Sequence, residues 1–114
     1  MQYINKIEIM GRVGAIRTQE IQGRKVANFS VMTELIQNLQ NSHCFTEATW
    51  HQVVAWENVS VDPQIFNMSK GDCVHVIGRI RHNKYTTVDG NDCIFQEIIA
   101  TEVKFIKSDE PCLK

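Results

Sequence analysis

The segment TWHQVVAW, residues 49–56, contains both tryptophans of the chain, six positions apart. In a β-strand alternate side chains share a face, so Trp50 and Trp56 would lie on one side with Gln52 and Val54 between them. A helix would separate the two indoles, because six residues turn through roughly 600° and leave them about 120° apart. The segment therefore predicts a strand with one aromatic face, and the intervening glutamine favours an accessible face.

Four further strands are predicted on either side of this segment. NKIEIMGRV (5–13) alternates apolar and polar residues, and KVANFSVMTE (25–34) follows a polar stretch with two glycines that we interpret as a bend and a turn. DCVHVIGRIRHNKY (72–85) alternates again, and CIFQEIIATEVKFI (93–106) follows VDGN (88–91), the strongest hairpin turn signal in the chain.

The connections complete an all-β pattern. LIQNLQNSHCF (35–45) is rich in Asn, Gln and Ser, and we expect a long loop or a mobile extension there. Asp62 and Pro63 resemble a helix N-cap followed by a first-turn proline, which predicts a short helix. Gly11 and Gly78 stand in the middle of the first and fourth strands, where a small barrel must bend sharply. The sequence thus predicts a five-stranded barrel with a short helix between its third and fourth strands.

Length and composition indicate one ordinary domain. We expect residues 1–107 of the 114 to form it and 108–114 to be a short flexible tail. No apolar run approaches the roughly 20 residues of a membrane span, and the charged N-terminus does not resemble a secretory signal, so we expect a cytoplasmic protein with no membrane partner. The formal net charge of −1 gives no support to a nucleic-acid ligand by itself.

The chemistry-bearing residues do not predict an enzyme. The sequence contains no phosphate-binding glycine loop, nucleophile elbow or HExxH motif, and its four histidines are scattered. The four cysteines have no CxxC spacing, so we expect no metal site and interpret them as free, mostly buried thiols. No cofactor and no small-molecule substrate are indicated.

Aromatic and basic residues interleave along the third and fourth strands. Tyr85 and the cations around it would join the two tryptophans in one groove that offers stacking platforms and phosphate partners. Single-stranded nucleic acid requires this combination, whereas duplex DNA does not expose its base faces. The alternative is that the indoles are core or interface residues and that the basic cluster protects a strand edge.

The chain resembles the bacterial single-stranded DNA-binding protein family over residues 4–106. The resemblance rests on NKIEIMGRVG, KVANFSV, TWHQVVAWE, KGDCVHVIGRIRHNKYTTVDGND and IIATEVKFI, in that order. It implies an OB-fold, a five-stranded Greek-key barrel, which assembles as a homotetramer in preference to a dimer. The implied function is sequence-independent binding of single-stranded DNA in replication, recombination and repair.

The resemblance assigns roles to individual residues. Trp50, Trp56 and Tyr85 match base-stacking positions, and His51 matches a position that supports subunit contacts. The candidate phosphate contacts are Lys6, Arg12, Lys70, Arg79, Arg81 and Lys84.

The sequence departs from the family pattern in three places, of which the first two, a missing stacking residue and a missing cation, predict weaker binding and the third, a missing tail, predicts loss of partner recruitment. Residues 35–40, after the second strand, contain no aromatic residue, Gln52 replaces a common arginine, and the long acidic-tipped C-terminal tail has no counterpart. We therefore interpret the chain as a short form. The alternatives are a tailless primosomal accessory OB protein and an OB-fold adaptor whose aromatic face binds protein. RNA is a further candidate ligand, because stacking platforms hardly distinguish it from DNA.

Overall fold

The computed structural model describes residues 2–38 and 44–106, which form five strands and one 3-10 helix. The strands are β1 (Ile7–Ile21), β2 (Arg24–Asn38), β3 (Cys44–Trp56), β4 (Cys73–Thr86) and β5 (Asp92–Ile106), and the helix is η1 (Pro63–Asn67). They close into a barrel in the order β1-β2-β3-β5-β4, with β3 and β5 parallel and the other neighbours antiparallel. The predicted all-β OB-fold with a short helix between the third and fourth strands is confirmed.

The barrel interior is filled by the inward-facing residues of all five strands and by Ile65 of η1. Val53 and Ala55 of β3 are 1% and 0% exposed, whereas Trp50 is 58% exposed. This alternation confirms that residues 49–56 form a strand with the tryptophans on its outer face. The largest fully buried side chains are Phe29, Ile65, Val31, Val53, Val74 and Val76.

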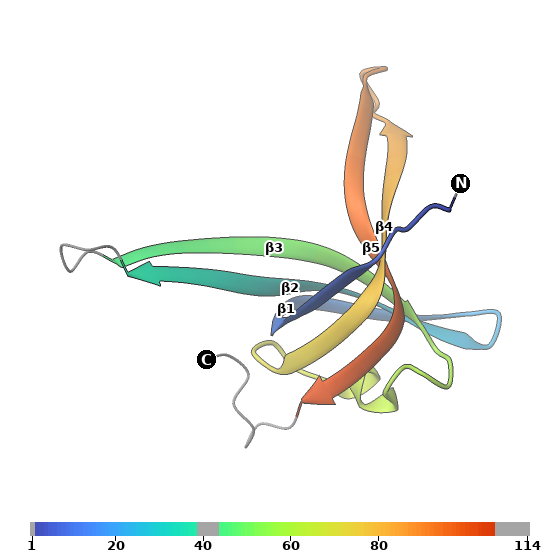
Figure 1. Cartoon of the computed structure of the whole chain (residues 1–114). Coiled ribbons are helices and arrows are strands. Elements are labelled where there is room, and N and C mark those ends of the chain that lie inside the picture. Colours follow the sequence, from blue (N-terminus) through green and yellow to red (C-terminus); the bar gives the residue numbers. More distant parts are fainter. Residues whose placement is uncertain (1, 39–43, 107–114) are drawn as a thin grey trace.

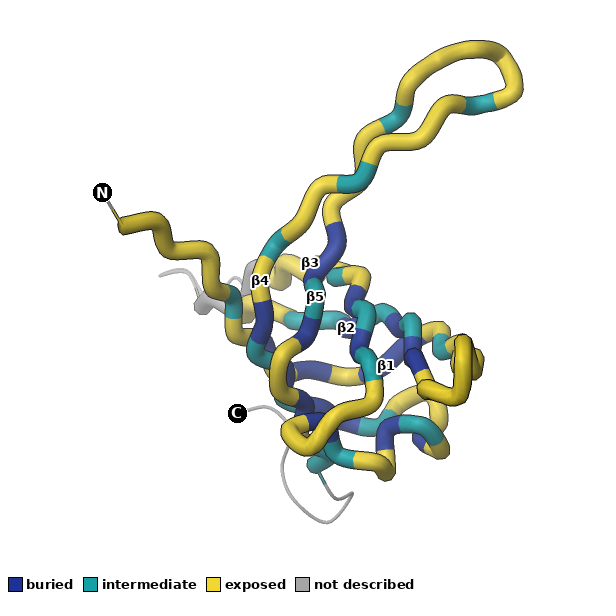
Figure 2. The backbone as a smooth tube through the Cα atoms, turned by 90° about the vertical axis from the view of Figure 1, so that its right-hand side faces the viewer, coloured by how far each residue is buried: buried dark blue, intermediate teal, exposed yellow. Residues whose placement is uncertain are grey.

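Two hairpins extend beyond the barrel as arms, one made by β2 and β3 and the other by β4 and β5 (Figure 1). Figure 2 shows the β4–β5 arm rising from the barrel with most of its residues exposed. The arms diverge because β3 and β5 pair only at Val53 with Ile98 and at Val54 with Ile99.

The predicted long loop at residues 35–45 is wrong at both ends. β2 continues to Asn38 and β3 begins at Cys44, with Leu35 opposite Glu47; residues 39–43 lie outside the described part of the chain. An arm with solvent on both faces needs no apolar alternation, since its strands pair through main-chain groups. The polar composition of the segment therefore suggested a loop where the backbone forms a ribbon.

The first strand is also longer than predicted. β1 runs to Ile21, and the bend expected after Val13 is a bulge, because the register with β2 shifts between Val13 and Ile16. The chain then turns tightly through Gln22 and Gly23, both with positive φ.

The turn and helix-cap predictions are confirmed. Gly90 of the β4–β5 hairpin has φ 86°, and the Thr87 amide donates to the Asn91 carbonyl at 2.8 Å. The Asp62 carboxylate accepts a hydrogen bond from the Gln64 amide at 3.0 Å and so caps η1.

The interpretation of the cysteines holds only in part. Cys93 is a free, partly buried thiol on β5. Cys73 at the start of β4 is buried and disulfide-bonded, so the expectation of a free thiol is wrong there. Sequence spacing alone carries no information on which thiols approach each other in space.

His51 occupies the inward side of β3 near the point where the arms diverge. Its Nε2 atom shares a hydrogen bond of 3.0 Å with Thr33 Oγ1 on β2. Burial lowers the pKa of the His51 imidazole below its ordinary value, because the charged form loses hydration.

Gly78→Ala should destabilise the barrel by about 1 to 3 kcal/mol through overpacking. A Cβ at Gly78 would collide with the carbonyl oxygen of Ile99 and lie 2.9 Å from the Ala100 Cα, and main-chain atoms cannot swing aside. Urea unfolding measures the loss, with Arg79→Ala on the exposed side of the same strand as the control. Equal midpoints for the two variants would refute the close approach.

The free energy of unfolding should fall as the pH is lowered from about 7 to about 5, partly through His51. Its pKa is lower in the folded chain, so the unfolded chain binds the proton more tightly and protonation favours unfolding. Urea unfolding across this pH range should give a shallower pH dependence for His51→Gln than for the unmodified protein. Parallel curves would contradict this assignment.

Candidate nucleic-acid interface

The outer face of β3 presents the two indoles differently. Trp50 is 58% exposed, which rules out a place for this ring in the barrel core, and Trp56 is half-buried. With the two tryptophans six residues apart at about 3.3 Å per residue, their Cα atoms are separated by about 20 Å. Gln52 and Val54 lie between them on the same face.

Strand register extends this face over β2 and onto β1. Trp50 pairs with Met32, which pairs with Arg12, and Val54 pairs with Asn28, which pairs with Arg17. Directly opposite residues in antiparallel strands share a face. Both arginines therefore lie on the same outer face as the tryptophans, on β1, with β2 between β1 and the tryptophan strand. We call the outer face of β1, β2 and β3 between Trp50 and Trp56 the tryptophan platform.

Arg24 adds a cation at the Trp56 end of the tryptophan platform. Its guanidinium carbon lies 5.3 Å from the centroid of the Trp56 ring, within the range of a cation–π interaction. The Arg24 Nε atom also donates to the Glu57 carbonyl at 3.1 Å, which fixes the side chain beside the indole.

Sequence reasoning missed Arg17 and Arg24. Arg24 directly follows the Gln22–Gly23 turn, and recognising a two-residue turn there would have paired Arg24 with Ile21 and brought it near the end of β3. Arg17 could be found only by counting from the bulge in β1, which the sequence signals weakly through Gly14.

Several of the expected phosphate contacts already have partners within the chain. Arg81 donates to the Glu97 carboxylate through Nη2 at 2.6 Å and through Nε at 3.2 Å, and Asn83 donates to the same oxygen. Lys84 lies 3.3 Å from the Asp92 carboxylate.

The remaining expected phosphate-binding residues differ in whether they have a hydrogen-bond partner within the described part of the chain. Arg12 donates to the Gly71 carbonyl at 3.1 Å. Lys6, Lys70 and Arg79 are exposed and make no hydrogen bond or ion pair with any residue that the structure describes. Arg17 is also exposed and forms no hydrogen bond or ion pair with a described residue, so these four cations are open to an external anion.

Tyr85 lies on the β4–β5 arm, away from the tryptophan platform. It stands opposite Cys93, and its ring meets Phe95 edge to face at a centroid distance of 5.7 Å. The hydrogen bond with the Cys93 thiol is the main cause that raises the pKa of Tyr85. The single groove expected from the sequence is thus divided within one chain into a platform and an arm, because the two hairpins diverge.

A cleft of about 350 Å³ lies where the arms separate. Its lining residues come from β1, β3 and β5 and are Ile7, Thr49, Trp50, His51, Gln52, Gln96, Glu97 and Ile98. Glu97 is only 8% exposed, and Arg81 compensates its charge. The cleft therefore places the exposed Trp50 indole beside amide groups and a neutralised carboxylate.

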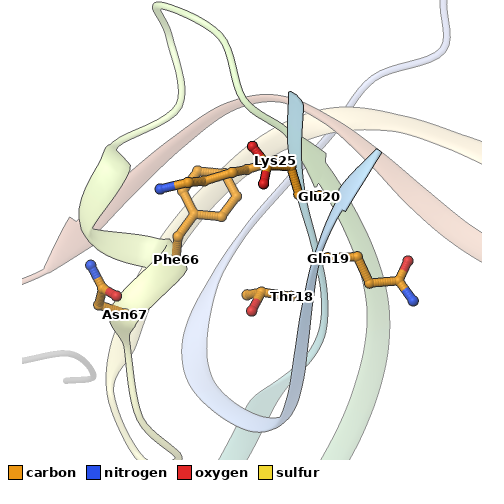
Figure 3. Close-up of a pocket in the computed structure, with 6 residues that line it drawn as sticks. All are labelled: Thr18, Gln19, Glu20, Lys25, Phe66 and Asn67. Atoms are coloured by element: carbon orange, nitrogen blue, oxygen red, sulfur yellow. The ribbon is translucent and has the colours of Figure 1, made fainter. Parts of the chain in front are cut away.

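A second cavity of about 310 Å³ lies between the β1–β2 hairpin and η1 (Figure 3). The Lys25 ammonium stands over the Phe66 ring, 5.8 Å from its centroid, and Thr18, Gln19, Glu20 and Asn67 complete the lining. This arrangement offers no pair of groups set for proton transfer or nucleophilic attack.

The described residues contain neither a candidate metal site nor a membrane-spanning helix. Within residues 2–38 and 44–106 no group of three or more His, Cys, Asp or Glu side chains could hold a metal ion. No helix in that part of the chain is long and apolar enough to cross a membrane.

Comparison with known proteins gives consistent matches. Residues 4–106 match the model of the single-strand binding protein family. The chain is 30% identical over 107 residues to a single-stranded DNA-binding protein of Neisseria meningitidis, covering 90% of this chain and 60% of that protein. It is 30% identical over 105 residues to the mitochondrial single-stranded DNA-binding protein of Drosophila melanogaster, covering 91% and 72% of the two chains. The chain thus spans about 60% of the length of the Neisseria relative.

Solved structures show the same architecture. The Plasmodium falciparum SSB in complex with ssDNA superimposes with a TM-score of 0.75 at 26% identity, covering 94% of this chain and 98% of that one. A deletion mutant of the single-stranded DNA binding protein from Thermus aquaticus has a TM-score of 0.71 at 13% identity, covering 92% of this chain and 51% of that one, and supports the fold alone. The family match spans nearly the whole chain, and this protein therefore belongs to the single-strand binding protein family.

Proposed function

We propose that this protein binds single-stranded DNA without sequence preference and performs no catalysis. The observation that carries the proposal is the exposed Trp50 on a sheet face bordered by arginines that form no ion pair with any described residue. Bases of a single strand stack on such rings for about 1 to 3 kcal/mol each, and the phosphates require cations. Family membership and the likeness to a structure determined with ssDNA support the same ligand.

The proposed strand crosses the tryptophan platform. Bases stack on Trp50 and Trp56, and Arg17 and Arg24 bind phosphates along the β1 side, with Arg12 at the Trp50 end. Arg24 already faces the Trp56 ring, so a base that stacks there would meet the guanidinium as well as the indole. Tyr85 and Lys84 on the β4–β5 arm, with Arg79, Arg81, Lys6 and Lys70, form a second stretch of the path.

The proposed assembly is a homo-oligomer, with a tetramer favoured over a dimer, and His51 supports its subunit contacts. Exposed apolar side chains on the two arms support self-association, since solvent-exposed Leu35, Ile36, Ile94 and Phe95 are unusual for a monomer. The proposed setting is the cytoplasm, in DNA replication, recombination and repair. Size-exclusion chromatography with light scattering tests the assembly, and a monomer at micromolar concentration would contradict it.

Trp50→Ala should weaken binding of a labelled thymidine oligonucleotide by about 1 to 3 kcal/mol, since it removes one stacking platform. The melting temperature should hardly change, because the Trp50 ring contributes little to the core. Fluorescence anisotropy measures the affinity, and Tyr3→Ala, which removes an exposed aromatic outside the strands, is the control. Unchanged affinity of the Trp50 variant would remove this ring from the interface.

Arg17→Ala should make the slope of log K against log salt shallower by about 0.7, the value for one lost phosphate contact on a single strand. Lys104→Ala is the matched control, since Lys104 is an exposed cation on β5, opposite His75 of β4 and outside the strands of the tryptophan platform. Titrations at several salt concentrations measure both slopes. If the Arg17 and Lys104 variants keep the same slope, Arg17 makes no phosphate contact.

A further inference from the structure

Gly14 lies in the bulge of β1, at the Trp50 end of the tryptophan platform. Val13 pairs with Val31 and Ile16 pairs with Phe29, so Gly14 and Ala15 fall in the register shift between them. The Ala15 amide donates to Ser30 Oγ at 3.1 Å, which satisfies a main-chain group that the bulge leaves unpaired. The bulge is therefore fixed to β2 at the residue next to Gly14.

The indole of Trp50 extends from β3 across β2 and rests on Gly14. A Cβ atom at Gly14 would lie 2.6 Å from Trp50 Cζ3 and 3.1 Å from Trp50 Cη2, and 2.7 Å from Ser30 Oγ. The six-membered ring of the indole thus occupies the space that any other residue at position 14 would fill. The ring remains 58% exposed although one edge is in contact with the sheet.

The backbone does not require glycine at this position. The described glycines with positive φ are Gly23, Gly71 and Gly90, and Gly14 is not among them. Gly11 and Gly78 are needed because a Cβ there would collide with main-chain atoms of the barrel. At Gly14 the nearest atoms belong to side chains, chiefly Trp50, so the requirement is for space beside the ring.

We propose that Gly14 is a positioning residue, which holds the Trp50 indole in a fixed orientation for base stacking. This inference rests on the proposed function and deepens it. An exposed indole with no packing partner would lose conformational entropy when a base binds and fixes its orientation. A ring already packed on Gly14 loses less conformational entropy on binding. Gly14 therefore acts on DNA affinity through Trp50 and contacts no base itself.

The first test is a double-mutant cycle. Gly14→Ala should weaken binding of a thymidine oligonucleotide by about threefold to tenfold, part of the loss expected when a stacking ring is removed entirely. In a Trp50→Phe background the same change should alter affinity less than twofold, since phenylalanine lacks the atoms Cζ3 and Cη2 that the new Cβ would meet. Ala15→Ser adds one atom to the exposed neighbouring residue and is the control.

A second readout needs no DNA. In a Trp56→Phe background Trp50 is the remaining tryptophan, and Gly14→Ala should shift its emission and increase its quenching by acrylamide while the thermal melt stays cooperative. Equal losses of affinity with Trp50 present and in the Trp50→Phe background, or an unchanged emission, would overturn the positioning role. Failure of the unmodified protein to bind any oligonucleotide would instead overturn the proposed function together with this inference.

Discussion

The pairing of β3 with β5 is the contact on which the rest of the structure depends. It closes the barrel through only two residue pairs, Val53 with Ile98 and Val54 with Ile99. Val53 and Ile98 are buried, so the closure also contributes to the core. The N-terminal parts of β3 and β5, which precede these pairs, diverge from each other, so each pairs with its own hairpin partner, since unpaired main-chain groups are costly. The arms and the cleft between them follow from this brief pairing.

The same closure determines which cations are open to an external anion. On β4 and β5 the long antiparallel register brings Arg81 opposite the buried Glu97, and that carboxylate requires the arginine for its own charge balance. On β1 and β2 no acidic residue forms an ion pair with Arg17 among the described side chains, and Arg24 is turned onto an indole. The formal net charge of −1 therefore does not describe the arginines near Trp50 and Trp56, which form no ion pair among the described side chains.

Much of the fold follows from local sequence signals. The positions of the side chains in residues 49–56 fit the two-residue period of a strand and no other regular structure. Asp62–Pro63 favours the start of a helix and Asp89–Gly90 favours a hairpin turn, and each signal consists of two adjacent residues. The Leu35 region was misassigned because an arm with both faces in water shows no periodicity. The disulfide of Cys73 and the ion pair of Arg81 depend on residues brought together by the register, which composition and spacing do not contain.

For the candidate site, the sequence predicted aromatic residues but not their distribution over two surfaces. It also missed the arginines that border the tryptophan platform, since their positions depend on a bulge and on a two-residue turn. These features are short, and a shift of one residue would move every following side chain to the opposite face. The register of β1 is thus the feature that sequence reasoning alone could not supply.

The most direct test of the central claim is the intrinsic tryptophan fluorescence of the unmodified protein during titration with an unstructured thymidine oligonucleotide. We expect strong, saturable quenching that weakens as salt is added and is nearly absent with a matched duplex, because only a single strand can stack its bases on Trp50 and Trp56. No quenching and no binding at low salt would contradict the claim, and the exposed face of β3 would then have to serve a protein partner.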